Sequence, residues 1–146
     1  MKVLLVNGGP HKEGCTYTAL TEVAKTLNEY KDIILCTKGN CDAEVDEMIS
    51  EFKFEDYIEL NIHGVDFFFS HGHKYNMDNL PPVGKVVVYG HFHTGFIEEQ
   101  YGIIFANPGS ISLPKNNTKH SYMIIDDQEL ILKEVEGNII DRKKYK

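Results

Sequence analysis

The sequence has few cysteines, no basic face and no hydrophobic run long enough to cross a membrane. Its three cysteines, Cys15, Cys36 and Cys41, form no Cys-x-x-Cys pair, so we expect free thiols. No segment approaches the roughly 20 apolar residues that a membrane span needs. The apolar opening at residues 3–6 runs into glycines too soon for a signal peptide. These absences predict a cytoplasmic protein with no membrane partner.

Positive charge is also scarce. The chain has 15 Lys and Arg residues against 22 Asp and Glu residues, which gives a formal net charge of -7. A chain of this charge is a poor candidate for binding a nucleic-acid backbone. The only basic cluster is residues 142–146, which we interpret as a solvated C-terminal tail.

The length of 146 residues, of which 42% are hydrophobic, predicts a single domain over residues 1–146. The front half has a βαβα pattern, with strands at 2–6 and 32–36 and helices at 16–30 and 43–52. The back half is rich in strands, mostly alternating and so expected to be antiparallel. We place them at residues 56–62, 65–70, 86–89, 96–99, 103–106, 121–125 and 129–135. A hairpin turn is expected at His63 and Gly64, and an irregular crossover at residues 76–84.

Two apolar strands are each followed by a His-x-His sequence. Residues 66–70 lead to His71 and His73, and residues 85–89 lead to Gly90, which we expect to turn the chain, and then to His91 and His93. If the strands are neighbours in one sheet, these imidazoles converge. Imidazole suits Zn, Mn, Ni and Fe, and an amide oxygen such as that of Asn40 suits harder ions. Asn40, His71, His91 and His93 are therefore candidate metal ligands, and His73 is a candidate proton donor or phosphate contact.

Four ordered motifs extend this pattern: residues 39–42 (Gly-Asn-Cys-Asp), 70–73 (Ser-His-Gly-His), 90–93 (Gly-His-Phe-His) and 107–110 (Asn-Pro-Gly-Ser). Over about residues 32–125 the chain resembles calcineurin-like metallophosphoesterases, in particular the small cytosolic phosphodiesterases. The resemblance implies a β-sandwich flanked by helices and a site for two metals. It also implies that Asn40, His71 and His91 bind the second metal and His93 the first. Residues 107–110 would form a structural turn behind the site that supplies no ligand.

The front of the chain lacks that family's Asp-x-His and Gly-Asp motifs. Residues 1–30 instead resemble the opening strand and helix of flavodoxin-like, NAD(P)H-dependent FMN reductases. There the loop with Gly8, Gly9, Cys15 and Thr16 would hold the flavin phosphate. The flavin-ring loops have no counterpart after residue 30, so FMN is not expected. The fold class is therefore α/β (α+β): a truncated metallophosphoesterase-like β-sandwich flanked by helices at 31–146, with an N-terminal βαβ unit whose flavodoxin-like strand and helix form a graft at 1–30.

The missing aspartates change the expected chemistry. The surviving ligands are all neutral, so two closely spaced dications would repel each other by several kcal/mol. We expect at most one divalent ion per chain, at Asn40, His71 and His91, with His11 as a candidate replacement ligand. We interpret Asp42 as a residue that holds its loop rather than a metal ligand.

Three functions are consistent with these features. The first is a metal-dependent phosphoesterase, impaired by its missing ligands, that acts on a small phosphate ester. The alternatives are a non-catalytic module for metal or phosphate anion (including a fusion remnant) and an FMN-binding oxidoreductase. Loss of a strand–helix unit would expose an apolar surface of the sheet, so we also expect a homo-oligomer.

Overall fold

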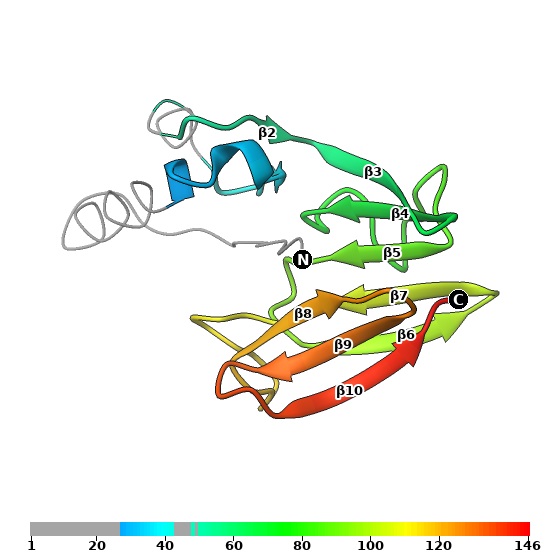
Figure 1. Cartoon of the computed structure of the whole chain (residues 1–146). Helices are drawn as coiled ribbons and strands as arrows, with labels where there is room; N and C mark the ends of the chain where they lie inside the picture. Colours follow the sequence, from blue (N-terminus) through cyan, green and yellow to red (C-terminus); the bar gives the residue numbers. More distant parts are fainter. Residues whose placement is uncertain (1–26, 43–47, 49) are drawn as a thin grey trace.

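The computed structural model describes residues 27–42, 48 and 50–146. Its strands form a five-stranded sheet in the order β3-β4-β5-β7-β6, a three-stranded sheet in the order β10-β9-β8, and a small sheet of β1 and β2 (Figure 1). The strand bounds are β1 (Cys36–Thr37), β2 (Phe54–Glu55), β3 (Tyr57–Ile62), β4 (Val65–Ser70), β5 (Val86–Tyr89), β6 (Phe96–Gln100), β7 (Ile103–Asn107), β8 (Ser121–Ile125), β9 (Glu129–Glu134) and β10 (Ile139–Lys144).

The β3–β4 hairpin forms where the sequence predicts it. His63 and Gly64 both have left-handed backbones, with φ of 52° and 84°, as a two-residue hairpin turn requires. The side chain of Asn61 supports the turn, because its Oδ1 accepts a hydrogen bond from the Gly64 N–H at 3.0 Å. Ile62 and Val65 pair directly across the turn, which sets the register of both strands.

The strands at 96–99, 103–106, 121–125 and 129–135 were expected to be mostly antiparallel, and β6–β7 and β8–β9 do pair in this way. The centre of the large sheet, however, is parallel. β5 pairs in parallel with both β4 and β7, and only β3 and β6 run antiparallel to their neighbours. All four residues of β5 are buried, which is typical of a strand covered on both faces. The long connection between β4 and β5 makes the parallel crossover possible. The carboxyl ends of β4, β5 and β7 consequently meet at one edge.

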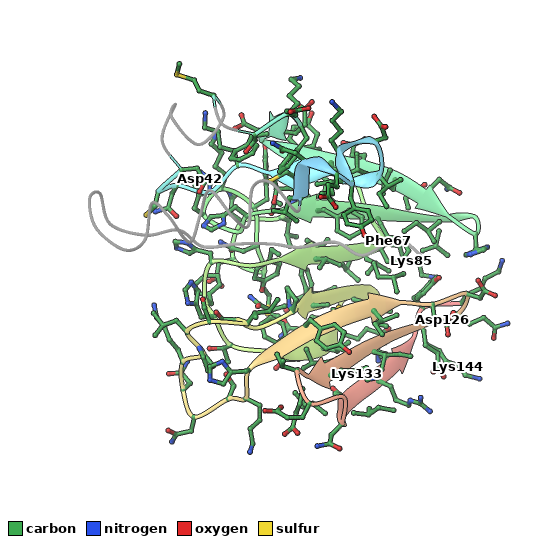
Figure 2. The ribbon with its side chains drawn as sticks, turned by 60° about the vertical axis from the view of Figure 1, so that its left-hand side comes forward. Asp42, Phe67, Lys85, Asp126, Lys133 and Lys144 are labelled. Atoms are coloured by element: carbon green, nitrogen blue, oxygen red, sulfur yellow. The ribbon has the colours of Figure 1, made fainter. Side chains whose placement is uncertain are left out.

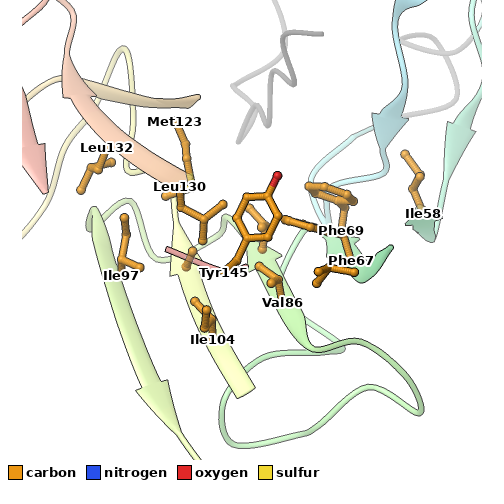
Figure 3. Packing of buried hydrophobic residues seen from close by; sticks show 13 residues of the cluster. Ile58, Phe67, Phe69, Val86, Ile97, Ile104, Met123, Leu130, Leu132 and Tyr145 are labelled. Carbon is orange, nitrogen blue, oxygen red and sulfur yellow. The ribbon is translucent and has the colours of Figure 1, made fainter. Parts of the chain in front are cut away.

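The main core lies between the large sheet and the second sheet (Figure 3). Phe67 and Val86 contribute from the large sheet, and Leu130 and Leu132 from β9. Each of these four side chains is nearly or fully buried. A second cluster on the opposite face contains Phe68, Val87, Tyr89 and Phe105. Burial on both faces holds the ends of β4 and β5 in fixed positions.

The C-terminal segment is a strand and not the solvated tail that its charges predict. β10 pairs antiparallel with β9, and the next residue, Tyr145, is only 3% exposed. Its ring meets that of Phe67 edge-on at 4.9 Å, and its hydroxyl donates a hydrogen bond to the Asp126 carbonyl. Charged side chains are common on an exposed edge strand, where they discourage pairing with other chains, so they do not exclude a strand.

The front of the chain also differs from the prediction. A 3-10 helix, η1 (Lys31–Ile33), occupies part of the predicted strand at 32–36, and the strand β1 begins only at Cys36. β1 pairs in parallel with β2. Of the predicted helix at 43–52, residues 50–52 are not helical, and residues 43–47 and 49 lie outside the described residues. The predicted strand at 2–6 and most of the helix at 16–30 lie outside the described residues. In the described part of the chain, no helix is long and apolar enough to span a membrane.

Candidate metal centre

The candidate site lies at the edge of the large sheet where β4 and β5 end. Ser70 pairs with Tyr89 at that edge, so the histidines that follow each strand emerge side by side. The rings of His71 and His91 are 5.0 Å apart at an angle of 72°. The sequence-based expectation that these two imidazoles converge is therefore met by the arrangement of the strands.

Asn40, in the loop after β1, completes a cluster of three donor atoms. Nε2 of His71 lies 2.9 Å from Oδ1 of Asn40 and 3.1 Å from Nδ1 of His91. Atoms that bind one ion at about 2.0–2.2 Å lie roughly 2.9–3.5 Å apart, so this spacing suits a shared metal. A neutral imidazole has a single N–H, so hydrogen bonds among these three atoms can satisfy only some of their lone pairs. A cation bound by all three atoms would satisfy them together.

The set is unusual because one of its members is an amide. Among the described residues, no three His, Cys, Asp or Glu side chains are grouped closely enough to hold a metal. Two imidazoles and one amide oxygen therefore make an uncharged partial shell. The resemblance to metallophosphoesterases implies a divalent metal, and these residues fit one ion with open positions for other ligands.

Burial keeps the central histidine neutral. His71 is 3% exposed, and this burial, together with His91, His73 and His93, lowers the pKa of His71 to about 4. The pKa of His91 is also lowered, first by burial and then by the neighbouring His73, His93 and Lys115. A histidine must be neutral to bind a metal, so both rings are suited to that role near neutral pH. Nδ1 of His71 is buried and has no hydrogen-bond partner among the described residues.

His73 and His93 flank this cluster without joining it. The exposed ring of His73 lies 5.4 Å from that of His71 and 6.5 Å from that of His91. Nδ1 of His93 lies 2.9 Å from the carbonyl oxygen of Leu113. If Nδ1 donates in this contact, Nε2 is the nitrogen that remains for a metal or a phosphate oxygen.

The loop that carries Leu113 is held by Ser110. The Leu113 N–H donates to Oγ of Ser110 at 2.9 Å, and the Lys115 N–H donates to the carbonyl of His93 at 3.0 Å. Sequence reasoning missed this support, because Ser110 was placed in a structural turn and Leu113 was not considered. The supporting atom of Leu113 is a backbone carbonyl, which leaves no mark in a sequence.

In the loops after β4 and β5, the left-handed backbone conformations lie at residues other than the one predicted. Gly90 was expected to provide the turn, but its φ is not positive. His91 and His93 instead have left-handed backbones, with φ of 65° and 60°. Such conformations are uncommon for residues other than glycine and are concentrated at functional sites. The glycine that the site requires is Gly72, with φ of 109° and little space for a side chain.

Asn107 holds the end of β5 from behind. Its fully buried side chain donates from Nδ2 to the Gly90 carbonyl at 2.7 Å, and its Oδ1 accepts from the Gly109 N–H at 2.9 Å. These bonds give the 107–110 turn the structural position that the resemblance implies. In the loop of Asn40, the Asp42 carboxylate accepts from the Gly39 N–H at 2.6 Å, as expected of a residue that holds the loop.

The remaining candidates lie outside the described residues. They are the predicted replacement ligand His11 and the predicted anion loop of Gly8, Gly9, Cys15 and Thr16. Their roles stay predictions.

Comparison with known proteins assigns the family. The model of the calcineurin-like phosphoesterase superfamily domain matches residues 16–129. The chain belongs to this superfamily. The match begins upstream of residue 32, where the resemblance was expected to start, and so includes half of the segment predicted to be a flavodoxin-like graft. The flavodoxin-like origin of residues 1–30 stays a prediction.

Two relatives of this calcineurin-like chain are themselves named phosphodiesterases. Phosphodiesterase YfcE of Escherichia coli is 34% identical over 129 residues, which cover 86% of this chain and 70% of the relative. Phosphodiesterase MJ0936 of Methanocaldococcus jannaschii is 29% identical over 97 residues, which cover 60% of this chain and 58% of that protein. The predicted function of a metal-dependent phosphoesterase is thereby confirmed at the level of the family.

Solved structures agree with the fold. The structure of YfcE, described as a phosphoesterase from E. coli, superposes with a TM-score of 0.82 at 32% identity, and the match covers 86% of this chain and 71% of that one. Vps29 of Entamoeba histolytica, solved in complex with Zn, superposes with a TM-score of 0.57 at 17% identity over 97% and 96% of the two chains. This second likeness concerns the fold alone.

Proposed function

We propose that this chain hydrolyses small phosphate esters with a single divalent ion, held by Asn40, His71 and His91, and that its activity is low. The observation that supports the proposal is the convergence of two neutral donor atoms on a third: Nε2 of His71 lies 2.9 Å from Oδ1 of Asn40 and 3.1 Å from Nδ1 of His91. Membership of the calcineurin-like superfamily supports the choice of phosphate esters. The donor set suits Mn, Zn, Ni or Fe.

When bound, a divalent ion supplies Lewis acidity toward a phosphoryl oxygen and lowers the pKa of a coordinated water. His71 and His91 contribute fixed lone pairs, because each lies within two residues of the end of a buried strand. Asn40 contributes a neutral oxygen from a loop held by Asp42. None of these ligands carries charge, so a second ion close to the first would be strongly repelled.

The flanking histidines complete the proposed roles. His73 is exposed, and its ring lies 5.4 Å from that of His71, so it is within reach of the group that leaves a bound phosphate. We assign it the transfer of a proton to the leaving oxygen. His93, oriented by the Leu113 carbonyl, has Nε2 available for the ion or for a phosphate oxygen.

A specific feature favours one other function. The chain lacks the family's Asp-x-His and Gly-Asp motifs. This absence favours an inactive module, which would bind metal or phosphate at the same cluster without hydrolysing an ester. We do not propose an FMN-binding oxidoreductase, because its loop lies outside the described residues. The predicted homo-oligomer stays a prediction, since the structure holds one chain.

The experiment compares hydrolysis of p-nitrophenyl phosphate and bis(p-nitrophenyl) phosphate by chelator-treated protein before and after adding Mn or Zn. We expect a slow, metal-stimulated rate that His71→Ala and His91→Ala abolish. His63→Asn is the matched control, because His63 lies in the β3–β4 turn and Asn tolerates its left-handed backbone. If metal binds but neither ester is hydrolysed, the proposal of an enzyme is wrong and the chain is an inactive binding module.

A further inference from the structure

Phe92 occupies an unusual position, between two candidate metal-site histidines. Its ring lies 5.2 Å from that of His91 at 79°, and 6.0 Å from that of Tyr89 at 77°. Tyr89 is buried, but Phe92 is 44% exposed. Single exposed apolar side chains are common and need no special explanation. What sets Phe92 apart is its direct contact with a ring of the Asn40–His71–His91 cluster.

The backbone of Phe92 is held on both sides. Its N–H donates to the Gly90 carbonyl at 2.7 Å, and its carbonyl accepts from the Thr94 hydroxyl at 3.3 Å. The Gly90 carbonyl is itself fixed by the buried Asn107 amide at 2.7 Å. The left-handed residues His91 and His93 flank this short segment. The ring of Phe92 is therefore presented from a fixed base, as a preorganised binding surface requires.

We propose that Phe92 binds the planar organic group of the substrate, so that the chain prefers phosphate esters of aromatic groups. The inference rests on the proposed function, because the phosphoryl group would lie at the Asn40–His71–His91 cluster. An aromatic group one ester bond away from that phosphorus would meet the exposed part of the ring. Stacked or edge-on aromatic contacts add affinity beyond buried area alone, whereas a small alkyl group gains little from them.

A packing role is the competing explanation. The ring of Phe92 contacts that of Tyr89 edge-on, and Tyr89 belongs to the buried cluster that also contains Phe68, Val87 and Phe105. Packing alone predicts that Phe92→Leu, which keeps most of the apolar volume, has no effect on ligand choice. Aromatic recognition predicts that this variant folds normally but loses much of the preference for aromatic ligands.

The test measures binding of phenylphosphonate and methylphosphonate, which are not hydrolysed, to Mn-loaded protein by calorimetry. We expect wild type to bind phenylphosphonate about three- to tenfold more tightly, the range expected from one aromatic contact. Phe92→Ala and Phe92→Leu should reduce this ratio toward one, with Mn stoichiometry and Tm monitored for each. Tyr101→Asn, which removes a 97% exposed aromatic at another left-handed position, should leave the ratio unchanged.

Three outcomes would contradict the inference. Equal affinity for the two phosphonates in wild type, no binding of either, or an unchanged ratio in Phe92→Leu would overturn the aromatic subsite. If Phe92→Ala fails to fold, Phe92→Leu decides the question. A protein that prefers phenylphosphonate but hydrolyses no ester would contradict the proposed function and leave the subsite intact.

Discussion

Asn40 and His71 are 31 positions apart in the chain, yet Oδ1 of the amide lies 2.9 Å from Nε2 of the imidazole. The contact joins the loop after β1 to the first residue after β4. Figure 2 shows Asp42, in that loop, far from Lys133 and Lys144 on β9 and β10. The donor atoms of the site thus come from residues after two central strands and from a separate loop, rather than from a single loop.

The close approach of the two histidine loops depends on Gly72. A Cβ at this position would lie 3.1 Å from the Gly90 carbonyl oxygen and 3.2 Å from Cβ of His91, at a φ of 109°. We expect Gly72→Ala to lower the free energy of unfolding by about 1–3 kcal/mol and to weaken Mn binding. Chemical denaturation and calorimetry measure the two effects.

Gly102→Ala separates strain from crowding. Gly102 also has a positive φ, of 76°, but a Cβ there would meet nothing within 4 Å. This control should lose stability with no change in Mn affinity. If both variants weaken Mn binding equally, the contact between the two loops does not shape the site.

Ser110 is linked to His93 through the backbone of Leu113, whose N–H donates to Ser110 and whose carbonyl contacts the His93 ring. We expect Ser110→Ala to remove the acceptor of the Leu113 N–H, at a cost of about 1 kcal/mol in stability. It should also loosen the bond from His93 Nδ1 to the Leu113 carbonyl, which nitrogen NMR detects as a change in the His93 tautomer ratio. The exposed Ser112→Ala is the control. An unchanged His93 spectrum in Ser110→Ala would show that the serine has no part in positioning the ring.

Substitution of Tyr145 tests whether the C-terminal segment contributes to the stability of the fold. Its ring packs on Phe67, and both side chains are nearly buried. Tyr145→Ala should lower the free energy of unfolding by about 3–5 kcal/mol, as for other buried aromatic residues. Thermal denaturation measures this loss against Tyr101→Asn. A loss below about 0.5 kcal/mol, the range of ordinary surface substitutions, would restore the solvated tail that the sequence predicts.

The thiol of Cys36 should react slowly. Burial, followed by the charge of Asp42, raises the pKa of Cys36 to about 11. In a Cys15→Ser, Cys41→Ser variant, its alkylation rate should rise about tenfold per pH unit between pH 8 and 10, since the thiolate is the reactive form. The folded state disfavours the thiolate, so this group should also reduce stability as pH rises above the ordinary thiol pKa of about 8.5. An alkylation rate that levels off near pH 9 would mean that burial does not raise the pKa of Cys36.

Parts of the site are readable from sequence because they follow strand periodicity. The runs before His71 and His91 are continuously apolar, which is typical of central strands, and parallel neighbours bring their carboxyl ends together. Asn40 was predicted from its amide oxygen and from a family motif rather than from periodicity, because a lone asparagine in a loop carries no periodic signal. The left-handed backbones of His91 and His93 were not predictable, since they arise from hydrogen bonds to residues distant in sequence. β10 was missed because the charges at its exposed positions hide the buried Tyr145.

The most direct test is a calorimetric titration of chelator-treated protein with Mn and with Zn, checked by elemental analysis. We predict one ion per chain, lost in His71→Ala and His91→Ala and weakened in Asn40→Ala, with His63→Asn unchanged. Two ions per chain would contradict the single-ion centre and require charged ligands beyond the Asn40–His71–His91 cluster. Binding that survives in His71→Ala would remove this cluster as the metal site.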